Sequence, residues 1–194
     1  MKRLLLLGGL VGCGGAMQVD PAFGDTAAQA QGVREMRVYL GHAGAVRGLA
    51  VYHQDAALIP VSIRELGEKH FPGKPVAYYE SEWHTGAGAV FEVEYDLGGG
   101  QTGEVSARAD GTLLYVEQPL PLAEVPPAVQ AAAVARVPGT LVSAETKHGP
   151  QVDQIEVKIE HAGRTHVLVL TRAGEVVWHG LRFPAKIEVP VPLR

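Results

Sequence analysis

The stretches KHFPGKPV, residues 69–76, and ARVPGTLV, residues 135–142, decide the fold of this chain. Each places an apolar residue directly before a Pro-Gly pair, and further apolar residues follow within a few positions. Proline cannot continue a helix, and it pushes the preceding residue toward extended geometry. The Pro-Gly pair therefore predicts the end of a helix, and the chain carries this signal twice.

The segments upstream of the two signals align with each other at an offset of 66 residues, because Pro60 matches Pro126. They read IPVSIRELGEKHFPG (59–73) and VPPAVQAAAVARVPG (125–139), with apolar residues at steps of three and four. This spacing is the stripe of an amphipathic helix. A proline near the first helical position costs no hydrogen bond there. The pattern predicts two equivalent helices.

The segments after each predicted helix alternate apolar and polar residues. In 90–96, Phe91, Val93 and Tyr95 alternate with acidic residues, and 154–160 repeats the pattern. A period of two predicts half-buried antiparallel strands. The acidic residues, expected on a solvated face rather than as paired catalytic carboxylates, are Glu92, Glu94, Asp96, Glu156 and Glu160. The other predicted strands, some with their turns, are 76–84, 104–108, 109–117, 141–149, 165–170 and 172–180.

The predicted fold class is α+β, with two tandem units that each pack one helix on a four-stranded antiparallel sheet. The 33–58 segment alternates less regularly and predicts N-terminal strands or a hairpin. The expected divisions are a lipoprotein-type signal peptide at 1–13, a flexible tether at 14–32, N-terminal strands at 33–58, a first repeat at 59–120 and a second repeat with a C-terminal extension at 121–194.

The order of these elements resembles PepSY-like domains, which are grouped with the β-lactamase-inhibitor-like (BLIP-like) fold. The resemblance covers about residues 59–183. Relatives often carry an aromatic-Asp-x-x-Gly turn before the last strand; the first unit keeps Asp110-Gly111, but the second has Ala173-Gly174. The resemblance implies a secreted or envelope-bound binding module, of a kind linked to the restraint of enzymes, often hydrolases. It carries over no catalytic residue.

The N-terminus, MKRLLLLGGLVGCGG, has the features of a secretory signal. Lys2 and Arg3 precede a short apolar run that is too short to span a bilayer. The residues before Cys13 resemble a bacterial lipobox, and the chain holds no other cysteine. Lipidation of Cys13 is therefore expected. The alternative is an ordinary signal peptide cleaved after Ala16 or, less favourably placed, after Ala30.

Charge and motifs exclude several classes of protein. Without residues 1–13, which contain Lys2 and Arg3, the net charge falls from −4 to −6, and no basic run occurs. This balance argues against nucleic-acid binding. No phosphate-binding Gly-Lys loop and no G-x-S-x-G motif is present, and the single Cys lies in the signal region. The sequence predicts no enzyme, no catalytic residue and no cofactor.

Three histidines raise the alternative of a metal site. His161 and His166 flank a predicted hairpin turn, and His179 lies on the neighbouring predicted strand. Three imidazoles at one sheet edge could hold Zn²⁺. Their spacing matches no known ligand motif, so polar positions on solvated strands are favoured and no metal is predicted.

Aromatic residues give the candidate binding site. Tyr115 and Trp178 occupy matching positions in the two units at an offset of 63 residues, and Trp83 lies in a predicted turn. In 113–116, Leu113 and Tyr115 are expected to face away from Leu114 and Val116. Trp and Tyr dominate the energetics of binding surfaces. Tyr115 and Trp178 are the candidate anchors, with Trp83 at the rim, provided that the units form one continuous sheet and leave this face open.

These observations predict an exported, periplasmic or outer-membrane-anchored lipoprotein that acts as a non-catalytic binding module. The expected partner is a protein or peptide, such as a hydrolase that the module restrains, with membrane contact through the lipid and no nucleic acid. One alternative is a structural or sensory envelope module that binds a small ligand. Another is a metal-dependent hydrolase built on the three histidines.

Overall fold

The computed structural model describes residues 26–27, 29–41, 44–86 and 88–185 of the 194-residue chain. The expected signal peptide at 1–13, its Cys13 and most of the expected tether at 14–32 lie outside these residues. Within the described ranges, no helix is both long enough and apolar enough to cross a membrane.

The described residues form one ten-stranded antiparallel sheet whose strands follow each other in space as they do along the chain. Two of the connections are long, and each carries a short 3-10 helix, η1 (Ala56–Leu58) or η2 (Leu122–Glu124), followed by an α-helix. The strands are β1 (Glu35–Leu40), β2 (Val46–His53), β3 (Val76–His84), β4 (Gly88–Gly98), β5 (Gln101–Arg108), β6 (Leu113–Pro119), β7 (Thr140–Gly149), β8 (Val152–His161), β9 (Arg164–Thr171) and β10 (Val176–Arg182).

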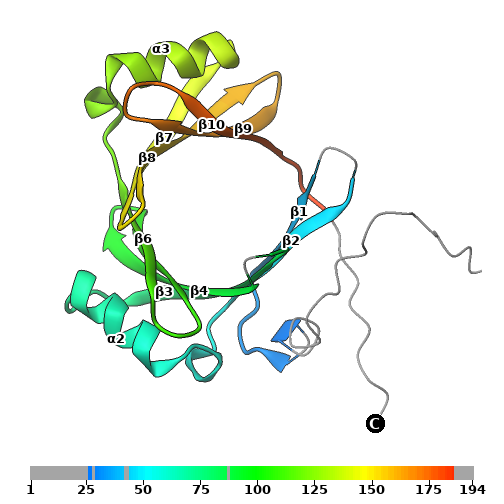
Figure 1. Ribbon diagram of the computed structural model, residues 1–194, viewed down its shortest axis with the longest axis vertical. Helices are drawn as coiled ribbons and strands as arrows, with labels where there is room; N and C mark the ends of the chain where they lie inside the picture. Colours follow the sequence, from blue (N-terminus) through cyan, green and yellow to red (C-terminus); the bar gives the residue numbers. More distant parts are fainter. Residues whose placement is uncertain (1–25, 28, 42–43, 87, 186–194) are drawn as a thin grey trace, which may run out of the picture.

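The sheet curls strongly, so it has a convex and a concave face (Figure 1). Both helices, α2 (Val61–His70) and α3 (Pro127–Arg136), lie on the convex face. The two edge strands approach each other: β10 ends near β1 in this view, and Arg182 acts electrostatically on Glu35. The concave face is therefore surrounded by strands on most sides.

The two helices begin and end as the prolines predict. Pro60 and Pro126 cap the N-termini of α2 and α3 with nearly the same backbone angles, φ −51° and ψ 138° against φ −54° and ψ 138°. At the other end, the amides of Phe71 and Val137 each donate a 2.9 Å bond to the carbonyl four residues back. The following Pro-Gly pair then stops the helix, because proline offers no further amide.

Each helix packs its apolar stripe on the convex face of the sheet. The α2 stripe meets Val93, Tyr95 and Val105 of β4 and β5, and the α3 stripe meets the apolar residues of β8 and β9. The small Gly67 lets the Tyr95 ring lie against α2, because a Cβ at that position would collide with the Tyr95 hydroxyl. The apolar halves of the alternating strands are thereby buried.

The predicted α+β fold of two separate units is wrong. The chain forms one curled sheet with two short helices on its outside. Strands β6 and β7 join the two halves through four residue pairs, from Val116 opposite His148 to Pro119 opposite Glu145. The individual strands and both helices lie where the sequence predicts them, but the sheet continues across the expected boundary at residue 120.

Two irregularities change which side chains share a face. In the pairing of β5 with β6, Tyr115 lies opposite Ser106 while Leu113 lies opposite the adjacent Ala107, so one residue is extra. Such a bulge reverses the alternation locally. As a result Leu113 and Val116 both contact the core under α2, and the expectation that they face opposite ways is wrong. A second register shift lies between Val176 and Trp178.

Candidate binding site on the concave face

The concave face is lined by charged side chains. Because alternate residues of β3 to β8 pack under the helices, the remaining ones point to the inside of the curl. Carboxylates face each other directly across neighbouring strands, as with Glu80 opposite Glu92 and Glu104 opposite Glu117. Like charges in this arrangement repel and destabilise a sheet. The face therefore concentrates acidic side chains instead of dispersing them.

Three of these carboxylates form a compact cluster, which we call the acidic triad: Glu80, Glu82 and Glu92. One ligand oxygen of each lies within 4.8 Å of the other two. Tyr39 donates a 2.9 Å hydrogen bond to Glu82, and Tyr115 donates a 3.0 Å bond to Glu92. These bonds hold two members in place while leaving free lone pairs on each carboxylate.

Glu80 is the member without such support. Glu80 is only 3% exposed, and no hydrogen bond of ordinary geometry reaches either carboxylate oxygen among the described residues, although the side chains of Glu82 and Tyr52 lie close enough to affect its pKa. Burial, followed by the charge of Glu92, raises the pKa of Glu80 well above its usual range. An unsatisfied buried carboxylate is costly, so this position calls for either a proton or a ligand.

Neighbouring ionisable groups separate the triad into distinct roles. Burial acts to raise the pKa of Glu82. Hydrogen bonds from groups that include His84 outweigh burial and hold this pKa below its ordinary value. His84 Nε2 lies 2.6 Å from Glu82, and this contact raises the pKa of the imidazole. Burial raises the pKa values of Glu92 and Glu104. The other charged or titratable groups around the triad are Arg37, Tyr39, Tyr52, Tyr115, Glu117 and Lys147.

In the other half of the concave face, lysines pair with the carboxylates. Lys147 lies 2.5 Å from Glu117 and 3.4 Å from Glu156. Lys158 lies 3.2 Å from Glu145 and 3.7 Å from Glu156. Burial acts to lower the pKa of Lys147. The carboxylates of Glu117 and Glu156 outweigh burial, raise this pKa and keep the amine charged. The expected solvated acidic face is therefore wrong for Glu92, which is buried, while Glu156 is held in ion pairs.

The two candidate anchors lie on the concave face. Trp178 is opposite Val169 in β9 and is 49% exposed, so its indole is open to a partner. Its ring folds over Gly180, where a Cβ would collide with it. Tyr115 is half-buried: its hydroxyl binds Glu92, and the Lys147 amine lies 4.7 Å from its ring centre. The two halves form one continuous sheet, which is the condition that the sequence analysis set for these anchors.

The predicted position of Trp83 in an exposed turn is wrong. Trp83 lies inside β3, is 6% exposed and packs with Leu49 and Val51 in a small core cluster. It alternates with Glu82 and His84, so its side chain is on the convex face, opposite the anchors. Trp83 therefore does not form the rim of the concave surface.

The three histidines come only partly together. His166 Nδ1 lies 3.0 Å from His179 Nε2, and the His161 ring is centred 6.2 Å from that of His166. The Arg136 guanidinium also points at His179, and burial with this charge lowers the pKa of His179. A cation next to the imidazole competes with a metal ion. Across the described residues, the one group of three ligands close enough for a metal is the acidic triad.

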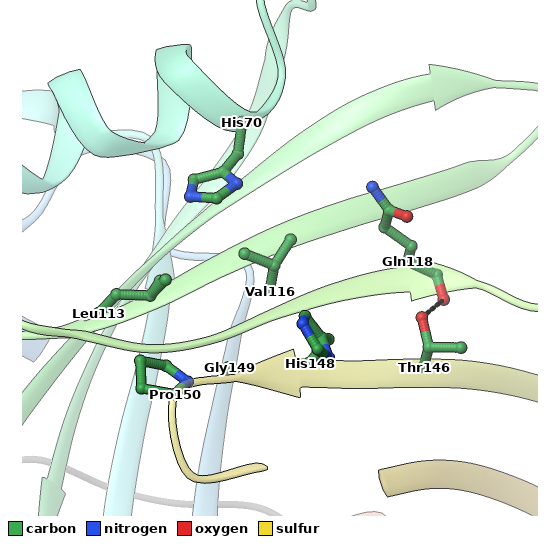
Figure 2. Close-up of a pocket in the computed structure, with 8 residues that line it drawn as sticks. All are labelled: His70, Leu113, Val116, Gln118, Thr146, His148, Gly149 and Pro150. Carbon is green, nitrogen blue, oxygen red and sulfur yellow. Dashed lines mark hydrogen bonds between the residues drawn. The ribbon is translucent and has the colours of Figure 1, made fainter. Parts of the chain in front are cut away.

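A pocket of about 400 Å³ lies outside the concave face, where α2 ends above β6 and β7 (Figure 2). His70 hangs over it from the helix, and Thr146 donates a 3.4 Å bond to the Gln118 carbonyl at its edge. The remaining lining residues shown there are Leu113, Val116, His148, Gly149 and Pro150. It is an open depression with little charge, so it offers few groups to orient a ligand.

Sequence reasoning missed the acidic triad. Alternation in 90–96 placed Glu92 on a polar face but gave no sign that this face is enclosed. The ESE stretch at 80–82 supplies the other two members from the neighbouring strand. Two acidic residues two positions apart, beside a strand with the same spacing, are the signal that could have found the cluster.

No protein-family model matches this chain, and no curated protein matches it. Among solved structures, a protein described as periplasmic from Bacteroides eggerthii is 18% identical, with 63% of this chain and 88% of that one covered and a TM-score of 0.49. A DUF2874 family protein from Bacteroides uniformis is 19% identical, with coverage of 63% and 88% and a TM-score of 0.48. A BLIP-like protein from Bacteroides fragilis is 18% identical, with coverage of 69% and 94% and a TM-score of 0.45. These similarities concern the path of the chain alone, and the resemblance to PepSY-like domains stays a prediction.

Proposed function

We propose that this protein is an exported, non-catalytic binding module that takes up a partner protein on its concave sheet face. The observation that carries the proposal is the exposed indole of Trp178 on a face that no helix of the described residues covers. A sheet needs one apolar face to pack its helices, and here the convex face serves that purpose. A large exposed aromatic on the opposite face is typical of a protein-binding surface.

Charge indicates the chemistry of the partner. Carboxylates line one half of the concave face, and the whole chain carries a net charge of −4. Electrostatic complementarity steers binding toward surfaces of opposite sign. The partner is therefore a protein that presents basic side chains to this face. The resemblance to modules that restrain enzymes makes a hydrolase the first candidate to test.

Replacement of Trp178 by alanine is expected to weaken partner binding about 30-fold, the effect of losing roughly 2 kcal/mol at a central aromatic anchor. Isothermal titration with the identified partner measures this change. Val134→Ala is the matched control, because Val134 is 47% exposed but lies on α3, on the convex face. Equal losses in both variants would contradict a concave binding surface.

Site-specific photo-crosslinking identifies the partner and tests the surface at once. A photoreactive phenylalanine derivative is placed at position 178 or, as the control, at position 134, in the native envelope. Adducts to one protein from position 178 alone support the proposal, and binding must then be reproduced with that purified protein. Adducts from position 134 alone place the surface on the other face. A small-ligand module would give no protein adduct from either position.

The proposal includes anchoring of the module to the envelope through Cys13, which the sequence motif LVGC supports. A lipidated cysteine carrying more than one acyl chain binds a membrane stably, whereas a single chain does so only marginally. The predicted tether that follows would hold the sheet away from the bilayer. Periplasmic or outer-membrane placement gives the concave face access to envelope proteins.

The Cys13→Ser variant is expected to move from the membrane fraction to the soluble fraction, because its attachment depends on the acylated thiol. Fractionation of cells, with mass spectrometry of the mature N-terminus, measures both location and cleavage site. The control is the Ser62→Ala variant, which keeps Cys13 and changes an unrelated residue on α2. A Cys13→Ser protein that stays membrane-bound and is cleaved at the same site would exclude lipid anchoring.

A further inference from the structure

We propose that the acidic triad of Glu80, Glu82 and Glu92 holds a divalent cation of the Ca²⁺ class on the concave face. This inference goes beyond partner binding and does not depend on it. The cluster of carboxylates is one observation, and the unpartnered, buried carboxylate of Glu80 is a second. Together they describe a group of carboxylate oxygens that could bind a cation, with the oxygens of Glu80 still without a hydrogen bond.

The spacing of the oxygens fits a single ion. Ca²⁺ binds oxygen at about 2.3–2.6 Å, so ligands on opposite sides of one ion lie about 4.6–5.2 Å apart. One oxygen from each member of the triad lies within 4.8 Å of the others. The strand pairing fixes this arrangement, because Glu80 lies directly opposite Glu92 and Glu82 is two residues along the same face. Water can complete the coordination sphere, as in many protein sites for this ion.

The tyrosine hydrogen bonds orient the ligands without saturating them. Tyr39 holds Glu82, and Tyr115 holds Glu92, each through a single hydroxyl. An ionised carboxylate can accept about four hydrogen bonds or metal contacts in total. Outer hydrogen bonds of this kind position metal ligands in known sites. Neither oxygen of Glu80 has a hydrogen bond of ordinary geometry among the described residues, so these oxygens are the ones that an ion would satisfy.

Comparison of the two halves of the face separates this site from an ordinary acidic surface. Glu117, Glu145 and Glu156 each contact a lysine amine. Among the described residues, no lysine or arginine forms an ion pair with the triad, and its one basic contact is that of His84 with Glu82. The same sheet face therefore pairs its carboxylates with lysines at one end, whereas at the triad Arg37 acts on Glu80 only through its charge and forms its ion pair with Glu35.

The depth of the triad favours a small ion over a basic side chain of a partner. All three glutamates are buried, and the rings of Tyr39 and Tyr115 lie beside their carboxylates. A divalent ion is smaller than a guanidinium, so it fits more readily among buried carboxylates, and it relieves the repulsion between Glu80 and Glu92.

The test is titration of the full-length protein, stripped with EDTA and dialysed, with CaCl₂ or MgCl₂ at about pH 7.5 or higher, because burial raises the pKa of Glu80 and the ion must displace any proton that this carboxylate keeps. Calorimetry is expected to show one equivalent of Ca²⁺ bound. At a hundredfold excess over Kd, the ion is expected to raise Tm by roughly 5–10 °C. Terbium luminescence excited through Tyr39 and Tyr115 reports whether the ion lies beside these rings.

Glu80→Gln and Glu92→Gln are expected to lose the binding heat, the rise in Tm and the terbium signal. Glu145→Gln is the matched control, since it removes a carboxylate from the same face but outside the triad. Circular dichroism confirms that each variant is folded, and Glu80→Gln should fold because it removes a like-charge contact.

Absence of Ca²⁺ binding by the wild type overturns the proposal. The repulsion within the triad would then be relieved by protons shared between its carboxylates. Retained binding in both triad variants, or an equal loss in Glu145→Gln, also overturns it. Crosslinking from position 178 in EDTA tests partner binding separately, so the two proposals can fail independently.

Discussion

Replacement of Phe71 by alanine is expected to lower the free energy of unfolding by about 3–5 kcal/mol, which corresponds to a Tm lower by roughly 10 °C. Phe71 is 5% exposed, and its ring stacks on Tyr95 with the ring centres 5.1 Å apart. It also fills the space over Gly103, where a Cβ would collide with it. The truncation leaves a cavity at the point where α2 meets the sheet. Urea or thermal unfolding measures the change.

Phe183→Ala is the control for this effect, because it deletes the same side chain from a position that is 60% exposed. It is expected to change stability by less than about 0.5 kcal/mol. Val137→Ala, at the equivalent end of α3, should cost less than Phe71→Ala because fewer atoms are removed. Neutral results at both Phe71 and Val137 would mean that the helices do not depend on these contacts.

The sequence predicted the elements well because their signals are local. Apolar steps of three and four, with proline at both ends, specify α2 and α3 without reference to the rest of the chain. Turn glycines behave in the same way: Gly111 and Gly174 have φ values of 85° and 89°, which other residues adopt at a cost. Alternation at a period of two then identified the strands between them.

The arrangement of the sheet could not be derived from those signals. Whether β6 ends one unit or continues into β7 depends on pairing between residues such as Val116 and His148, separated by the α3 connection. Edge strands with unpaired amides look the same in sequence as strands with a partner. The repeated pattern favoured two units, but joining β6 to β7 removes two exposed edges, and the structure adopts that solution.

The candidate site was hidden for a related reason. Alternation separates two faces of a sheet but does not say which face water reaches. Strong curling encloses the polar face here, so Glu80 and Glu92 are buried although their pattern is that of solvated strands. Trp83 was misplaced because it was assigned to the turn that ends the predicted 76–84 strand rather than to the interior of β3. Tyr115 and Trp178 share the concave face, and their role as binding anchors stays a prediction.

A second large effect is expected in the pH dependence of stability. Burial raises the pKa of Glu80 well above the ordinary value of 4.5. Above that pH the unfolded chain releases this proton while the folded protein keeps it, so the folded state binds more protons. Stability from this group is therefore full below about pH 4.5 and falls as the pH rises. Each pKa unit of difference corresponds to about 1.4 kcal/mol. Glu104, whose pKa burial also raises, acts in the same direction.

The comparison of wild type with Glu80→Gln isolates this contribution, because other groups also titrate. Burial lowers the pKa of His53, so that residue makes stability rise with pH, and contact with Glu82 raises the pKa of His84, with the opposite result. Both histidines are present in the two proteins, and their effects cancel in the difference. In EDTA, Glu80→Gln is expected to gain stability relative to wild type steadily from about pH 5 to about pH 8. Urea unfolding across this range measures the difference, and Glu145→Gln should lack the rise. A difference that stays constant with pH would show that Glu80 is already ionised in the folded protein, since only a carboxyl that keeps its proton on folding can make the gap widen.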